Sequence, residues 1–113
     1  MNEILTDPER SFASSIYVQL EVLPKASFYG REEESILYSQ YFKIVRHWAP
    51  VGEALLQEAL EAAFRCGLSA LDALHVASAL AVGADELITN EKPGKPIHRV
   101  QGITVRTIYA PSS

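Results

Sequence analysis

The chain has 113 residues, of which 48% are hydrophobic and 21% are charged, and its net charge is −4. This length allows a single domain with a real core over residues 1–113, and the composition excludes a disordered chain. The acidic balance argues against a broad surface that coats nucleic acid, although it leaves open a nuclease whose acids hold metal ions. The single cysteine, Cys66, excludes an internal disulfide and a cysteine zinc cluster.

The first elements are short. Residues 1–5 are compatible with the end of a helix, and residues 11–14 predict a short strand. A helix is expected over residues 16–23, with Ser14 or Ser15 as its cap. Pro24 is expected to end this helix, because proline lacks the backbone donor that a helix interior needs.

Residues 31–48 predict a long helical segment with acidic residues at its start, which suit the positive end of a helix dipole. Its apolar residues recur at helical spacing: Leu37, Tyr41, Ile44, Val45 and Trp48. Residues 43–48 are also compatible with a short strand, and periodicity alone does not decide between the two.

Two further helices follow. Residues 52–65 predict an amphipathic helix that Gly67 ends. Its expected apolar face consists of Leu55, Leu56, Ala59, Leu60, Ala63 and Phe64. Residues 69–82 predict a helix that is apolar almost all round, so we expect it to be the most buried helix of the domain.

The C-terminal part predicts strands at residues 86–89 and 103–108, separated by a polar turn at 90–96. Helices between strands favour an α/β domain with a small, mostly parallel sheet. No apolar run reaches membrane-spanning length, and the N-terminus does not resemble a signal peptide. We therefore expect a cytoplasmic protein without a membrane partner.

Three acidic residues lie where predicted elements begin or end, and each has two interpretations. Asp72 follows Ser69 by three positions, so the local pattern favours the acid of a capping box, although a carboxylate in the first turn of a helix can also face a cleft. Glu21 lies within the apolar run VQLEVL and needs a partner, a metal or an exposed position. Glu91 directly follows a predicted strand, where ligands of parallel sheets bind, although its turn also resembles an ordinary exposed turn.

The order of these motifs resembles that of PIN domains, which are small α/β metal-dependent nucleases and common toxins of bacterial toxin–antitoxin pairs. In the run GLSALDALHVASALAVGADELITNEKPGKPI, Asp72 opens a buried helix and Gly83-Ala84 leads into a strand that ends in Thr89-Asn90-Glu91. The run SFASSIYVQLEVL resembles the second strand and following helix of the family, which places the second acid of the family at Glu21.

This resemblance implies a three-layer PIN-like fold and a site in which Glu21, Asp72 and Glu91 are the catalytic acids and hold Mg²⁺ or Mn²⁺, ions that prefer oxygen ligands. Thr89 and Asn90 would orient a ligand or a water molecule. Basic residues that follow the acids would meet the phosphates of an RNA substrate, if they are not simply an exposed loop: Lys92, Lys95, His98 and Arg99. His75 would pack beside the site. An antitoxin protein is the partner that the resemblance implies.

The chain departs from the family pattern at its N-terminus. The first strand of the family lies at the centre of the sheet and ends in an aspartate that binds metal, and no segment here matches it. We therefore expect an N-terminally truncated PIN-like fold. Four explanations stay open: a natural start upstream, a degenerate relative with altered packing, pairing of two chains, or a strand donated by a partner protein. A milder departure is Glu91, because aspartate is commoner at that position.

Two functions from different classes are compatible with this pattern. The first is a metal-dependent ribonuclease with an incomplete acidic site, possessing Glu21, Asp72 and Glu91 but no counterpart of the first aspartate. The second is a non-catalytic PIN-like module for interaction or oligomerisation. The absent first aspartate favours the second function for these 113 residues, whereas the family resemblance favours the first for any longer natural protein.

The missing strand also predicts self-association, because unpaired strand edges and exposed apolar helix faces favour contacts between copies. We expect light scattering at micromolar concentration to give a mass above the 12.5 kDa of one chain. A monomeric mass would contradict this prediction.

Overall fold

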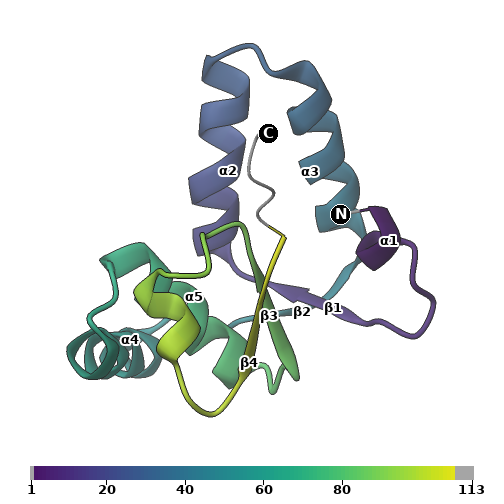
Figure 1. Cartoon of the computed structure of the whole chain (residues 1–113). Coiled ribbons are helices and arrows are strands. Elements are labelled where there is room, and N and C mark those ends of the chain that lie inside the picture. The colour runs from purple at the N-terminus through teal and green to yellow at the C-terminus, as the bar shows by residue number, and fades with distance from the viewer. Residues whose placement is uncertain (1, 109–113) are drawn as a thin grey trace.

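A computed structural model of the chain describes residues 2–108. One or two helices separate successive strands along these residues (Figure 1). The elements are α1 (Asn2–Leu5), β1 (Phe12–Ser14), α2 (Ile16–Phe28), α3 (Glu32–Ile44), β2 (Val45–Trp48), α4 (Glu53–Cys66), α5 (Ala70–Ala81), β3 (Glu86–Thr89), η1 (Pro96–Arg99) and β4 (Thr104–Thr107).

The strands form two separate sheets of two strands each. β1 pairs with β2 in parallel, with α2 and α3 between them in the chain, and β3 pairs with β4 in parallel across η1. The predicted α/β class and the predicted parallel pairing are therefore confirmed. The prediction of one small sheet is wrong, because no hydrogen bonds join the two pairs within residues 2–108.

α2 begins where the sequence predicts but extends past Pro24. Ser15 is its cap, and the Val18 amide donates to the Ser15 hydroxyl at 3.2 Å. The helix runs on to Phe28, so the predicted end at Leu23 is wrong. Proline removes one helical hydrogen bond, the bond to the carbonyl four residues earlier, at Leu20. Leu20 is 68% exposed, so the bond is lost at a residue that solvent reaches.

α3 and β2 divide the long apolar segment between two kinds of structure. α3 ends at Ile44, and Val45 turns to extended angles with φ of −67° and ψ of 126°. β2 follows at once, which confirms the strand alternative for this segment. The Tyr41 hydroxyl on α3 donates to the Ala13 carbonyl on β1 at 2.9 Å. This bond fixes α3 to the first sheet.

The hydrophobic core lies between α4, α5 and η1. α5 buries more of its residues than any other helix described, as its apolar sequence predicts. Gly67 ends α4 in the left-handed region at a φ of 67°, as predicted for a residue without a side chain. The buried cluster consists of Ala49, Leu55, Ala59, Ala62, Leu68, Ala73, Val76, Ala77 and Ile97.

α4 turns only part of its apolar face toward this core. Leu55 is buried, whereas Leu56, Leu60 and Phe64 are 49%, 51% and 83% exposed. Six apolar residues were expected on the buried face, so that expectation is wrong for these three. The apolar stripe of α4 is wider than the surface of α5 and η1 that packs against it.

None of the helices in residues 2–108 combines the length and the apolar content that crossing a bilayer requires. This finding concerns the described part of the chain alone.

Ile97 is the residue whose truncation tests the core most directly. It is 1% exposed on the single turn of η1, against α4 and α5. We expect Ile97→Ala to lower the free energy of unfolding by about 2–5 kcal/mol, because a cavity replaces buried methyl groups. Urea denaturation measures this loss. Ile36→Ala, at a site that is 58% exposed, is the matched control and should change stability far less.

Candidate functional site: the cleft between the two sheets

A cleft of about 1070 Å³ separates the two sheets. Residues of β1 line one side and residues of β3 line the other, and α5 contributes residues from Asp72 to Ala79. α5 contacts both β1 and β3, so it is the common support of the two sheets. At the start of the strands, Arg10 forms an ion pair with Glu86 at 3.6 Å. This contact joins the segment before β1 to the first residue of β3.

Asp72 uses its backbone in the helix cap, which leaves its carboxylate for the cleft. Its amide donates to the Ser69 hydroxyl at 3.3 Å, so the predicted role of Ser69 as cap is confirmed. Within residues 2–108, no hydrogen bond returns from the Ser69 amide to the Asp72 carboxylate, so the capping box is only half formed. The carboxylate lies in the first turn of α5, where the helix dipole favours a negative charge.

Glu21 and His75 make a direct contact between α2 and α5. The Nε2 of His75 lies 3.2 Å from the Glu21 carboxylate and donates to it. The His75 side chain is 13% exposed and that of Glu21 is 37% exposed. The expectation that His75 packs beside the site agrees with this placement. The sequence gives no sign of this pair, whose members are 54 positions apart.

Glu91 is held by its backbone rather than by its side chain. Its amide donates to the Thr89 hydroxyl at 3.1 Å, and its carbonyl accepts from the Thr107 hydroxyl at 2.6 Å. The Nε2 of His98 also lies 3.2 Å from that carbonyl. These bonds fix the loop after β3 and leave the Glu91 carboxylate unbonded within residues 2–108. The fixing roles of Thr107 and His98 are absent from the sequence-based expectations.

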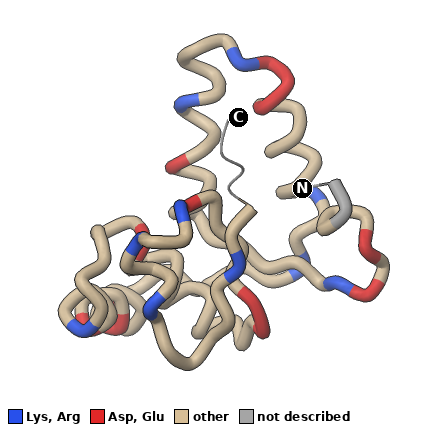
Figure 2. The backbone as a smooth tube through the Cα atoms, viewed as in Figure 1, with Lys and Arg blue, Asp and Glu red and all other residues tan. Residues whose placement is uncertain are grey.

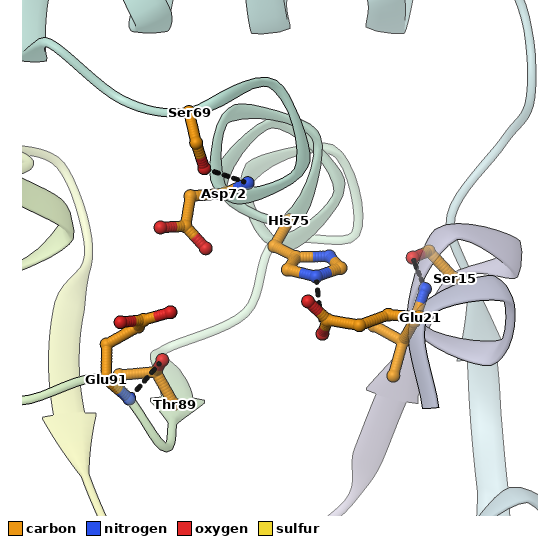
Figure 3. A network of polar contacts seen from close by, with 8 residues as sticks. Ser15, Glu21, Ser69, Asp72, His75, Thr89 and Glu91 are labelled. Carbon is orange, nitrogen blue, oxygen red and sulfur yellow. Dashed lines mark hydrogen bonds and ion pairs between the residues drawn. The ribbon is translucent and has the colours of Figure 1, made fainter. Parts of the chain in front are cut away.

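The three predicted acids share one cleft but do not converge. Glu21, Asp72 and Glu91 all line it, together with Thr89 and Asn90. Figure 3 shows the Asp72 and Glu91 carboxylates directed into a common space, while the Glu21 carboxylate turns toward His75.

The basic residues that were expected to meet substrate phosphates lie outside this space. Lys92 and Lys95 are exposed and do not line the cleft. Their substrate-binding role therefore stays a prediction, and the residues that line the cleft do not include them.

These acids do not fit a metal ion as they are arranged. In the part of the chain that the structure describes, no three His, Cys, Asp or Glu side chains come together so that they could hold an ion. Hard cations such as Mg²⁺ need several oxygen ligands at short range. Here the Glu21 carboxylate is already bonded to His75. We therefore derive no chemical step through a metal.

Two tyrosines of α3 also face the cleft. Burial raises the pKa of the Tyr41 hydroxyl. Burial also raises the pKa of Tyr38, and the charges of Glu34 and Glu21 add to the effect. Both side chains line the cleft as neutral phenols at ordinary pH.

Comparisons with protein-family models, with curated proteins and with solved structures find no match to this chain. A function for the chain is therefore inferred from the geometry of the cleft and from the sequence motifs that line it.

The two roles of Asp72 can be separated by substitution. We expect Ser69→Ala to lower the free energy of unfolding by about 1 kcal/mol, because it removes the acceptor of the Asp72 amide. Asp72→Asn keeps that amide, so it should change stability by less than about 0.5 kcal/mol at moderate salt. Urea denaturation of both variants measures the difference. An equal loss in both would contradict the separation of cap from carboxylate.

Proposed function

We propose that this chain is a non-catalytic PIN-like module that binds a protein segment in the cleft between its two sheets. The observation that carries this proposal is the division of the strands into two parallel pairs whose open edges line one cleft. An open strand edge carries unpaired backbone donors and acceptors and is a ready template for another chain.

The PIN-like part of the proposal rests on the sequence motifs and on the class of fold. Asp72 opens the helix α5, Gly83 and Ala84 follow it, and Glu91 ends the segment after β3, in the order typical of that family. Parallel strands with helices between them support the same assignment. The family name remains part of the proposal.

Two observations favour binding over catalysis. The carboxylates line the cleft without forming a group that could hold an ion, among residues 2–108. Lysine and arginine are scattered over the backbone rather than gathered in a stripe that would follow a nucleic-acid strand (Figure 2). RNA-binding surfaces need such clustered positive charge.

A second candidate function is a Mg²⁺- or Mn²⁺-dependent ribonuclease of the toxin type, with an antitoxin as its partner. One observation favours it, namely that Glu21, Asp72 and Glu91 line the same cleft although they lie far apart in the sequence. Carboxylate oxygens are the ligands that such ions prefer.

Selection of displayed random peptides tests the binding module. We expect peptides to be enriched on the natural chain and lost on Ala79→Trp, because Ala79 is 8% exposed at the wall of the cleft and an indole there fills it. Ala81→Trp is the matched control on the exposed side of the same helix and should retain the peptides. If Ala79→Trp does not fold, Val18→Trp at the opposite wall repeats the test. Enrichment that survives both cleft variants would sink the proposal.

Calorimetry with Mn²⁺ separates the two candidates. We expect no Mn²⁺ binding that depends on Asp72, because the acids are not arranged as a ligand set in residues 2–108. The experiment titrates Mn²⁺ into the natural chain and into Asp72→Asn. Binding to the natural chain that weakens by tenfold or so in Asp72→Asn, a loss typical of a missing charged ligand, would instead favour the nuclease.

A further inference from the structure

On the edge of β1 that faces the cleft, one backbone carbonyl already accepts a hydrogen bond from a side chain. The Ser14 carbonyl accepts from the Ala49 amide at 2.9 Å, so Ser14 faces the β2 side. Backbone groups of neighbouring strand residues point to opposite edges, and Ala13 therefore faces the open edge. Its carbonyl accepts from the Tyr41 hydroxyl at 2.9 Å. A side chain thus takes the place that the amide of a neighbouring strand would otherwise fill.

β3 presents a matching edge. The Thr89 carbonyl accepts from the Ile108 amide at 2.8 Å, which places Thr89 on the β4 side. The same alternation turns the backbone groups of Ile88 toward the cleft, and Ile88 lines it. The starts of β1 and β3 are also linked, since the side chain of Arg10 before β1 pairs with that of Glu86 at the start of β3.

Further polar atoms in the cleft lack hydrogen-bond partners. Within residues 2–108, the hydroxyls of Ser14 and Ser78 and the Nδ1 of His75 are buried without a hydrogen bond, and all three residues line the cleft. Ser78 is only 5% exposed. Buried polar groups without partners are uncommon and costly. Their position indicates that the cleft is suited to an occupant with hydrogen-bonding groups.

The charge of the cleft selects the chemistry of that occupant. Eight aspartates and glutamates line it, against three lysines and arginines. Two of these three cations already have partners, because Arg10 pairs with Asp7 and Glu86, and Arg31 pairs with Glu34. Beyond the carboxyl ends of β1 and β3, the cleft is lined by the carboxylates of Glu21, Asp72 and Glu91.

From these contacts we infer that the cleft binds an extended apolar peptide segment that runs parallel to β1 and β3 and carries a lysine or arginine at its carboxyl end. The segment pairs with the open edges at Ala13 and Ile88, and it displaces the Tyr41 hydroxyl from the Ala13 carbonyl. Its cationic end lies beside the Asp72 and Glu91 carboxylates, which are directed into a common space, and charge-assisted hydrogen bonds are strong. The segment is expected to be apolar because strands of parallel sheets are usually buried on both faces and consist mainly of hydrophobic residues. This inference rests on the proposed binding function.

The test uses three synthetic peptides with the full chain. The matching probe is acetyl-GTVVIVKG-amide. The second probe, acetyl-GTVVIVEG-amide, reverses the charge at the carboxyl end, and the third, acetyl-GKVVIVTG-amide, moves the lysine to the amino end. We expect the matching probe to bind about tenfold more tightly than either of the others, the size of effect typical of a charge-assisted hydrogen bond. Fluorescence anisotropy of labelled peptides measures the affinities.

Two readouts report the strand pairing itself. Tyr41→Phe frees the Ala13 carbonyl, so it should raise the affinity for the matching probe by a factor of roughly three to ten. Tyr29→Phe removes a hydroxyl from a tyrosine that is 64% exposed and does not line the cleft, and should leave the affinity unchanged. In the natural chain, bound peptide should slow amide hydrogen exchange at Ala13 and Ile88.

Each contrary outcome has a definite meaning. Equal binding of the lysine and glutamate probes, or unchanged exchange at Ala13 and Ile88, overturns the inference. Tighter binding of the glutamate probe in the presence of Mn²⁺ also overturns it, since the carboxylates then hold an ion. If none of the three probes binds but displayed peptides still require an open cleft, the inference falls and the proposed function stands. If the displayed peptides do not require the cleft either, both fall.

Discussion

The open edges of two parallel strand pairs are the constraint on which this structure depends. A strand turns half of its backbone groups to each side, and groups that find no partner away from water are costly. β1 has a neighbour on one side only, and so does β3. α5 contacts both strands, while Arg10–Glu86 and Glu21–His75 join the two halves at either end of the cleft. The Tyr41 hydroxyl satisfies one edge carbonyl. The cleft between the two sheets is therefore lined by one edge of β1 and one edge of β3.

The same separation explains the behaviour of the acidic residues. Glu21 meets a histidine, Asp72 gains the dipole of α5, and the Glu91 backbone is fixed while its carboxylate stays unbonded within residues 2–108. The three carboxylates therefore have three different surroundings and do not converge on one point among residues 2–108.

Sequence-based prediction succeeds here where the deciding interactions are local. The Ser69 cap and the apolar run after it determine α5, and the left-handed Gly67 ends α4. Prediction fails where solvent decides. Pro24 stays within α2, and the residue whose carbonyl loses its helical bond, Leu20, is exposed. Phe64 belongs to the apolar pattern of α4, but the core offers no surface to cover it. The apolar pattern shows which face of a helix favours burial, whereas the neighbouring elements decide how much of that face is buried.

The sequence by itself determined the α/β class, the positions of β1, β3 and β4, the caps of α2 and α5, and the three acids as candidates for one site. These features depend on hydrophobic period, caps and glycines, which act over a few residues. Only the tertiary structure decided that the sheet is divided, that His75 meets Glu21, and that Tyr41 occupies the edge of β1. Those outcomes depend on contacts between segments that lie far apart in the sequence, and local sequence patterns do not show which of these segments meet.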